Sequence, residues 1–214
     1  MRVDLHSHTM WSGDATTTPD ELEAAVVAAG IDVLCITDHN TTAGAVALDG
    51  RLPCRVVVGE ELRTVVGEVI GLFLTESLPR GLPLVDAVDR IHDQGGVVYV
   101  PHPFDPTRHC LREAELLALA DAGLVDAVEV LNAKTSLRSL NERAAAFAAD
   151  RDLAAGAGSD AHVPDALGAA YVEMPDFDSP ADFLDSLRRG RIVGHHWDGP
   201  RPWRSRIVPS TKAG

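Results

Sequence analysis

Short β-rich runs alternate with helical runs along most of the chain, and this alternation limits the possible folds more than any other feature of the sequence. The runs expected to form strands are residues 2–5, 31–36, 55–58, 69–73, 97–100, 127–131 and 154–157. The runs expected to form helices are residues 19–30, 84–94, 111–122, 137–151 and 180–189. Such alternation favours a parallel sheet covered by helices, and about seven strand–helix units fit the chain. We therefore predict an α/β fold whose strands close into a barrel, with an open doubly wound sheet as the alternative.

Local signals mark the ends of one predicted helix and the burial of one strand. Thr18 is a suitable N-cap, Pro19 suits the first helical turn, and Glu21 can complete a capping box. Gly30 follows the expected end of this helix. Residues 97–100 form a continuous β-branched and aromatic run, which is typical of a buried parallel strand.

The length of 214 residues fits one well-packed domain. We assign residues 1–196 to this domain and expect residues 197–214, which are rich in Pro, Arg and Ser, to be loosely ordered. No run approaches the ~20 consecutive apolar residues that a membrane span needs. Residues 1–6 already belong to an expected strand, so we expect no signal peptide.

The formal net charge of −13 and the three cysteines restrict the partners and the compartment of the protein. Long nucleic acids bind proteins through Lys and Arg, so we expect no extended duplex partner, although a bound metal cluster can reverse the charge locally. Cys35, Cys54 and Cys110 are odd in number and form no zinc-binding or disulfide pattern. A cytoplasmic location fits this pattern best, and Cys35 is expected in the core.

Potential metal ligands follow the ends of the predicted strands. They are His6, His8, His39, Glu61, His102, Asp160 and His162. Ligands of α/β proteins bind outside the carboxyl ends of the strands, so these side chains are expected to meet there. His6 and His8 are two residues apart and point to the same side of an extended segment. Five of the nine histidines lie at strand ends, whereas scattered structural histidines would show no such bias. The sequence therefore predicts a metal site.

Other polar residues near the strand ends are weaker candidates. Asp14 lies in the loop after the first strand and is either a ligand or an ordinary turn residue. Glu60 and Glu61 are adjacent, so only one of them is expected to face the site. Glu68 stands just before an apolar run and is either a ligand or a charge at the strand entry. His109 lies near the Pro-His-Pro segment and is a candidate for supporting the ligands.

Five segments of the chain resemble, in the same order, the motifs of the PHP (polymerase and histidinol phosphatase) superfamily. They are residues 4–9 (DLHSHT), 37–40 (TDHN), 59–61 (GEE), 101–103 (PHP) and 158–162 (GSDAH). These segments are spread along nearly the whole chain. The resemblance implies a distorted (β/α)7 barrel of the PHP type, with a trinuclear metal site at the carboxyl ends of the strands.

The resemblance also implies a ligand set for each ion. The implied sets are His6, His8, Glu61 and Asp160 for the first ion, Glu61 and His102 for the second, and Asp14, His39 and His162 for the third. The residues of the first set are also the ones expected to be catalytic. Many relatives place a histidine in the strand after the bridging glutamate, and we expect Glu68 to replace that ligand here.

Imidazole and carboxylate ligands suit Mn²⁺, Fe²⁺ or Zn²⁺, with Mg²⁺ as a further candidate, and we expect two to three divalent ions. Two ions about 3.5–4 Å apart can bind a phosphate and supply a bridging hydroxide. We therefore predict a phosphoesterase that hydrolyses phosphate esters by a metal-bridged hydroxide. The side chains expected to contact the substrate are Arg108, Asn132, Lys134 and Arg138. Solvated loop charges are the alternative for the three basic ones.

The predicted substrate is a phosphorylated small molecule, a nucleotide or the end of a short oligonucleotide. Only 40 residues lie between Glu61 and His102, too few for an inserted cap, so we expect an open site. Two alternatives stay open. A metal-dependent amidohydrolase normally needs a bridging lysine, for which we find no well-placed candidate. A non-catalytic metal-binding accessory module tends to lose ligands that this chain retains. No membrane association is expected, and the sequence leaves the oligomeric state open.

Overall fold

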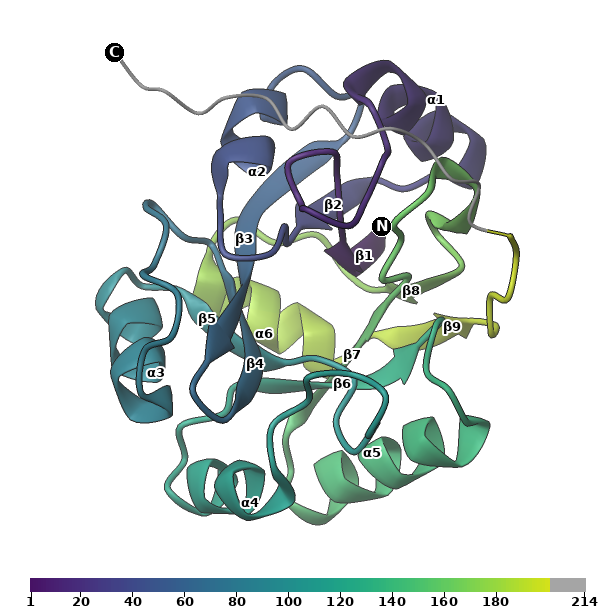
Figure 1. The fold of residues 1–214 in the computed structure, drawn as a ribbon. Helices are drawn as coiled ribbons and strands as arrows, with labels where there is room; N and C mark the ends of the chain where they lie inside the picture. Colours follow the sequence, from purple (N-terminus) through teal and green to yellow (C-terminus); the bar gives the residue numbers. More distant parts are fainter. Residues whose placement is uncertain (201–214) are drawn as a thin grey trace.

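Strands and helices alternate along residues 1–200, which are the residues that the computed structural model describes (Figure 1). The strands are β1 (Arg2–Ser7), β2 (Val33–Ile36), β3 (Arg55–Thr64), β4 (Gly67–Leu72), β5 (Val97–Val100), β6 (Ala127–Asn132), β7 (Ala154–Gly158), β8 (Ala170–Glu173) and β9 (Arg191–Gly194). The helices are α1 (Pro19–Ala29), α2 (Ala43–Leu48), α3 (Leu84–Asp93), α4 (Glu113–Asp121), α5 (Arg138–Asp150) and α6 (Pro180–Arg188), with a short 3₁₀ helix η1 (Pro164–Ala166). None of these helices is long and apolar enough to cross a membrane.

One sheet joins the strands of the described residues in the order β7-β6-β5-β4-β3-β2-β1-β8-β9. β1, β2 and β3 run parallel, as do β5, β6 and β7. The sheet curls until the segment after β7 meets β1, where Asp160 N donates to His6 O (2.8 Å) and His8 N donates to Ala161 O (2.9 Å). These bonds nearly close the sheet, so the predicted α/β barrel is confirmed over the open doubly wound sheet.

Not every strand follows the predicted parallel arrangement. β4 pairs antiparallel with β3 and β5, and β8 pairs antiparallel with β1 and β9. Only residues 65–66 separate β3 from β4, whereas a parallel crossover needs about a dozen residues or more. The two strands therefore form a hairpin, and β3 continues to Thr64, well past its predicted end at residue 58.

The predicted start and end of α1 are confirmed. Thr18 Oγ1 accepts a hydrogen bond from Glu21 N (3.4 Å), and Thr18 N donates to the Glu21 carboxylate (3.0 Å). Gly30 ends the helix with a φ of 63°, in the left-handed region that glycine adopts at low cost. The sequence does not predict α2, because a run of six residues is too short to show a helical period.

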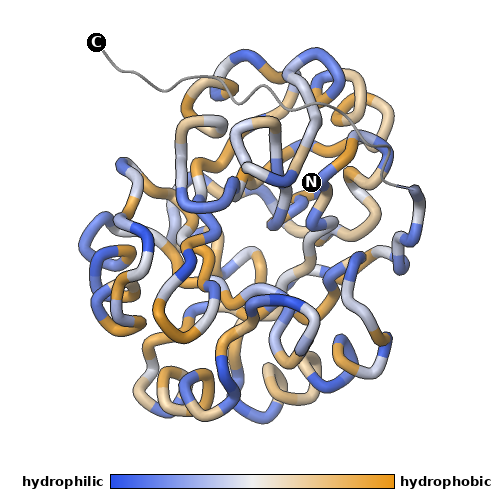
Figure 2. Tube along the Cα trace, in the orientation of Figure 1, coloured by the Kyte–Doolittle hydropathy of each residue, from blue (hydrophilic) through white to orange (hydrophobic). Residues whose placement is uncertain are grey.

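Apolar side chains fill the barrel and the layer between the strands and the outer helices. Figure 2 shows hydrophobic stretches along the strands and within the helices. Val3 and Leu5 of β1 pack inside the barrel, and Phe183 of α6 joins the same cluster. The segment before α6 lies at the amino ends of the strands, since Arg55, the first residue of β3, donates to Phe177 O (2.7 Å). α6 therefore covers that end, and the carboxyl ends of the strands form the opposite face.

The predicted tail begins in contact with the barrel. Trp197 N donates to Ala133 O (2.7 Å), which belongs to the loop after β6. Residues 201–214 lie outside the described residues. The division of the chain at residue 196 therefore stays a prediction.

Candidate metal centre

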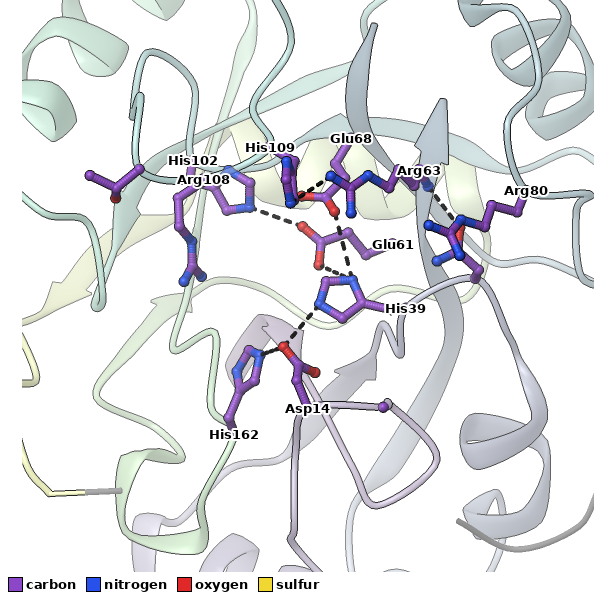
Figure 3. Close-up of a pocket in the computed structure, with 13 residues that line it drawn as sticks. Asp14, His39, Glu61, Arg63, Glu68, Arg80, His102, Arg108, His109 and His162 are labelled. Atoms are coloured by element: carbon purple, nitrogen blue, oxygen red, sulfur yellow. Dashed lines mark hydrogen bonds and ion pairs between the residues drawn. The ribbon is translucent and has the colours of Figure 1, made fainter. Parts of the chain in front are cut away.

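A cavity of about 530 Å³ opens at the carboxyl ends of the strands (Figure 3). It is lined by Gly13, Asp14, His39, Asn40, Glu61, Arg63, Glu68, Arg80, His102, Thr107, Arg108, His109 and His162. These residues come from β3, β4 and the segments that follow β1, β2, β4, β5 and β7. The volume lies within the range of about 300–1,000 Å³ that is typical of small-molecule sites.

Two buried histidines from β1 and the residue after it lie at the base of this site. The Nε2 atoms of His6 and His8 are 3.1 Å apart. His6 Nε2 lies 3.5 Å from Glu61 Oε2 and 3.8 Å from Asp160 Oδ1. The corresponding distances for His8 Nε2 are 3.3 Å and 3.5 Å. The structure thus brings together the four residues expected at the first ion, because residues two apart in an extended segment face the same side.

Glu61 is the carboxylate that most of the histidines share. It also lies 3.1 Å from His39 Nδ1 and 2.9 Å from His102 Nε2. Burial raises the pKa of this carboxyl, but the surrounding histidines outweigh burial and hold the pKa well below its usual range. Glu60 instead accepts a hydrogen bond from Leu78 N (3.0 Å). Glu61 is therefore the one of the two that faces the cavity, because successive strand residues point to opposite faces.

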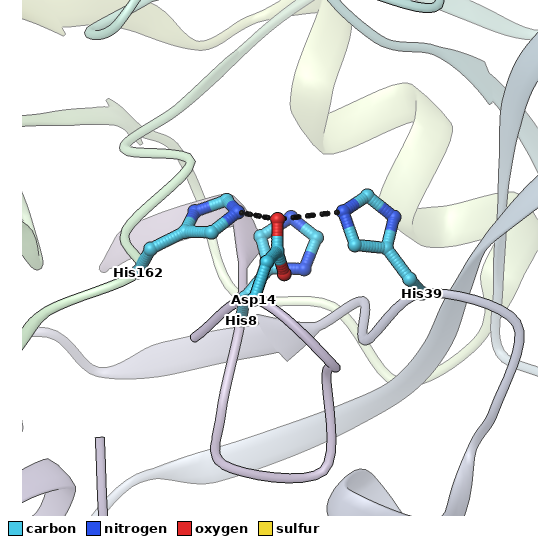
Figure 4. Close-up of side chains that lie close together, drawn as sticks. All are labelled: His8, Asp14, His39 and His162. Carbon is cyan, nitrogen blue, oxygen red and sulfur yellow. Dashed lines mark hydrogen bonds and ion pairs between the residues drawn. The ribbon is translucent and has the colours of Figure 1, made fainter. Parts of the chain in front are cut away.

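Asp14 approaches the histidines from the loop after β1 (Figure 4). Its Oδ2 lies 2.9 Å from His162 Nε2 and 3.4 Å from His39 Nε2. The ring of His8 lies behind Asp14 in this view, and its centroid is 4.5 Å from that of His39 and 4.3 Å from that of His162. Burial raises the pKa of Asp14, but the hydrogen bonds with the two histidines lower it far below its usual range. Asp14 is thus placed among potential ligands and not in an isolated turn.

The donors form four groups in which all ligand atoms lie within 4.8 Å of one another. The groups are His8, Asp14, His39 and His162; His6, His102 and Asp160; His6, His8 and Glu61; and Glu61, Glu68 and His102. Asp160 Oδ1 is buried without a hydrogen-bond partner, which is costly for a carboxylate and which a bound cation relieves. Mixed imidazole and carboxylate donors suit divalent transition-metal ions. The residues present therefore fit a metal centre.

Family profiles match two parts of the chain, the PHP domain at residues 4–72 and the PHP-associated region at residues 138–192. Uncharacterized protein MJ0417 of Methanocaldococcus jannaschii is 37% identical over 202 residues, which cover 88% of this chain and 79% of that protein. The chain belongs to the PHP family. Uncharacterized protein MJ1587 of the same organism is 38% identical over 146 residues, which cover 62% of this chain and 82% of that protein.

Solved structures with low sequence identity share the PHP fold. A two-domain protein of Bacteroides vulgatus that contains a predicted PHP-like metal-dependent phosphoesterase matches with a TM-score of 0.73 and 19% identity. The match covers 91% of this chain but only 65% of that protein. An amidohydrolase of Chromobacterium violaceum, solved with bound sulfate and no metal, matches with a TM-score of 0.64 and 19% identity, over 91% of this chain and 98% of the other.

In this PHP protein Glu68 belongs to β4, and the β3–β4 hairpin brings it to the cavity. Glu68 pairs opposite Arg63 in the antiparallel register. Its Oε1 lies 4.0 Å from His39 Nδ1, and its side chain is only 6% exposed. Burial and the negative charge of Glu61 raise the pKa of Glu68 to about 7. A carboxyl this close to other ionisable groups fits a metal ligand better than a charge at the strand entry.

We expect Glu68→Ala to lower the occupancy of one ion and to leave the others bound, since Glu68 belongs to a single group of donors. Elemental analysis of the metal-loaded variant measures this loss. Glu23→Ala, on the exposed side of α1, is the matched control and is expected to keep full occupancy. Unchanged metal content in Glu68→Ala, with a stability change within about 0.5 kcal/mol, would instead mark Glu68 as an ordinary strand charge.

Three of the four side chains predicted to contact substrate surround Asp160. Arg108 forms an ion pair with its carboxylate. Asn132 Nδ2 donates to Asp160 Oδ2 (3.2 Å), and Lys134 Nζ lies 3.6 Å from Oδ1. Arg138 lies on the first turn of α5, with 91% of its side chain exposed, and is not among the described residues that line the cavity. Its position fits the alternative of a solvated charge.

Glu129 is a buried member of the site that is not among the residues predicted from the sequence. Its Oε1 lies 3.1 Å from His6 Nδ1, and its Oε2 accepts hydrogen bonds from His102 N (2.6 Å) and Asn132 Nδ2 (2.9 Å). Burial raises the pKa of Glu129, but the charge of His6 outweighs burial and lowers it. The available signal is a single acidic residue within the apolar residues 127–131, because a buried carboxylate needs partners. By holding Nδ1, Glu129 directs Nε2 of His6 into the site.

Proposed function

We propose that this PHP protein is a metal-dependent phosphoesterase that hydrolyses phosphate esters. The observation that carries the proposal is the convergence of five histidines and four carboxylates in overlapping groups, with Glu61 shared between two of them. Overlapping groups suit neighbouring ions, and neighbouring ions suit a phosphate, which offers several oxygens.

The proposed centre holds two to three divalent ions, with Mn²⁺, Fe²⁺ and Zn²⁺ as the ions best suited to its donors. The proposed ligand sets are His6, His8, Glu61 and Asp160; Glu61, Glu68 and His102; and Asp14, His39 and His162. When bound, such ions activate water near neutral pH and neutralise phosphate charge. Glu61 belongs to two of these sets, since its Oε1 lies 2.9 Å from His102 Nε2 and its Oε2 lies 3.3 Å from His8 Nε2.

Side chains around Asp160 are proposed to position the substrate. The Arg108 guanidinium lines the cavity, where it can donate two parallel hydrogen bonds to a phosphate. Lys134 Nζ lies 2.9 Å from His162 Nδ1 and adds a second positive charge at this edge of the site. Asn132 holds the carboxylates of Glu129 and Asp160 and so keeps the ligand atoms in place.

The proposed substrates are phosphorylated small molecules, nucleotides or the ends of short oligonucleotides. The net charge of −13 disfavours binding of an extended duplex. Cys35, Cys54 and Cys110 are all unpaired, which supports the proposed cytoplasmic location.

A hydrolysis screen with metal-loaded protein tests this function. The panel contains phosphomonoesters, phosphodiesters, nucleotides and, for the amidohydrolase alternative, amides with the same leaving groups. We expect phosphate release that depends on Mn²⁺ or a related ion and is stopped by a chelator. Amide hydrolysis without phosphate release would favour the amidohydrolase alternative, and no turnover of either class would favour an accessory metal-binding module.

A further inference from the structure

Two arginines and a histidine form one wall of the cavity, separate from the proposed metal ligands. Arg63 comes from β3, Arg80 from the segment after β4, and His109 from the segment after β5. Figure 3 shows them across the cavity from Asp14 and His162. We refer to Arg63, Arg80 and His109 as the basic wall.

Backbone hydrogen bonds hold the three segments of the basic wall together. Gly81 N donates to Arg63 O (2.8 Å), which sets Arg80 beside the end of β3. Glu68 N donates to His109 O (2.7 Å), which fixes the opposite side of the hairpin. The fit is tight, because a Cβ added at Gly67 would lie 2.5 Å from Cys110 O. The fold therefore fixes the backbone positions from which the side chains of the basic wall extend.

Arg63 lies opposite Glu68 of β4, but the guanidinium groups of the basic wall form no ion pair with an acidic side chain of the described residues. Among the described residues, no carboxylate oxygen lies within 4.0 Å of the guanidinium of Arg63 or Arg80, whereas Arg108 on the same cavity pairs with Asp160. Arg63 Nη2 donates to His109 Nε2 at 2.5 Å. His109 is thus a positioning residue for Arg63.

The cavity has room for more than one phosphate group. Its volume of about 530 Å³ is several times that of a phosphate, and the proposed ligands line only part of its surface. Two unpaired guanidinium groups on an acidic protein attract anions, and arginine binds phosphate or carboxylate through paired hydrogen bonds. The wall thus suits a second anionic group that lies away from the metal ligands.

We propose that Arg63 and Arg80 bind a second anionic group of the substrate, so that preferred substrates carry a phosphate or carboxylate besides the scissile phosphate. This inference rests on the proposed phosphoesterase function. It narrows the substrate class to esters with two anionic groups on one small molecule.

Binding of phosphonates tests the basic wall without any turnover, because their P–C bonds are not hydrolysed as esters. Metal-loaded protein is titrated calorimetrically with methylphosphonate, with alkane bisphosphonates of increasing chain length, and with 3-phosphonopropionate. We expect at least one bisphosphonate to bind about tenfold more tightly than methylphosphonate, which corresponds to about 1.4 kcal/mol. The carboxylate compound shows whether the wall takes a carboxylate as well as a phosphate.

Variants assign this preference to the wall. Arg63→Gln and Arg80→Gln are each expected to reduce the ratio of the bisphosphonate affinity to the methylphosphonate affinity at least about threefold. Arg51→Gln is the matched control, because Arg51 is exposed and pairs with Asp20 away from the cavity, and it is expected to keep the ratio. A wild-type protein without preference for any two-anion compound, or variants that keep the wild-type ratio, would overturn the inference.

Phosphonate binding and ester hydrolysis, measured on the same proteins, test the anion-binding inference and the proposed function separately. Ester hydrolysis without a preference for two anions would reject the wall and keep the phosphoesterase. A two-anion preference that depends on Arg63 and Arg80, in a protein that cleaves no phosphate ester, would reject the phosphoesterase and keep the wall as an anion-binding site.

Discussion

Glu61→Gln is expected to reduce turnover of a phosphate ester at least about 100-fold. Mutation of a residue that only hydrogen-bonds a metal ligand already lowers metal affinity or activity about 10–100-fold. Glutamine keeps the size of the side chain but removes the negative charge that four histidines surround. It also replaces one carboxylate oxygen with an amide nitrogen, which is a poor metal ligand. The measurement is kcat/KM of the metal-loaded variant, together with its metal content.

Glu60→Gln is the matched control for Glu61→Gln, because the two residues are adjacent, buried and of the same type. The Glu60 carboxyl accepts a hydrogen bond from Leu78 N and does not line the cavity. Burial raises the pKa of Glu60 to about 7, so a neutral side chain is already partly populated there. We expect Glu60→Gln to retain most of the activity. Loss of activity in Glu60→Gln with retention in Glu61→Gln would contradict the register of β3 at the site.

Removing the metal is expected to stop turnover and to lower the melting temperature of the protein. Ligand binding to the native state at 100 times the dissociation constant stabilises it by about 2.7 kcal/mol. For a chain of this size, that corresponds to a shift of about 5–10 °C for each ion. Thermal melts with metal and with chelator measure the shift, and elemental analysis should find two to three equivalents in the loaded protein.

The metal-dependent shift is expected to grow as the pH rises from 7 to 9. Burial lowers the pKa of His6, but Glu129 and Glu61 outweigh burial and raise it to about 10 in the metal-free site. Stability from a raised pKa is complete below the unfolded value of about 6.5 and is lost as the pH rises through the folded value. The metal-free protein therefore loses stability over this range. As His6 and Glu68 lose their protons with rising pH, protons compete less with the metal for the ligand atoms.

Two observations would contradict the prediction that these residues bind metal ions. A melting temperature that is the same with metal and with chelator would show that the donors hold no ion in the native state. A metal-dependent shift that shrinks between pH 7 and 9 would show that protons do not compete for the ligand atoms.

The pH dependence of the hydrolysis rate is a separate test. A rate that falls at acidic pH and recovers with added metal would support the proposed ligands, whereas an acidic decline that is independent of metal would indicate a single catalytic acid or base.

The barrel and most of the cluster at its mouth can be predicted from the sequence because both depend on short patterns. Apolar runs of strand length alternate with capped helices, and each parallel strand ends at the same face of the barrel. A polar residue just after such a strand is therefore carried to that face whichever neighbour the strand has. The spacing of His6 and His8 adds that both imidazoles point to the same side.

The direction of β4 and the members of the site that it positions depend on the tertiary structure. The two-residue turn before β4 forces a hairpin, which lengthens β3 and sets Glu68 and Arg63 side by side at the cavity. The sequence shows Glu129 only as a lone acidic residue among the apolar residues of β6, and its partner His6 is set by the position of β1.

The sequence by itself determines the class of fold, the open face and the chemistry of the ligands, because strand ends and residue spacing are local properties of the chain. The tertiary structure alone decides how far the donors lie from one another and which charges remain unpaired. Arg108 forms an ion pair with Asp160, whereas Arg63 and Arg80 form no ion pair with a carboxylate of the described residues, although all three arginines lie in segments that line the same cavity. Such differences arise from contacts between residues far apart in the sequence, and no local pattern encodes them.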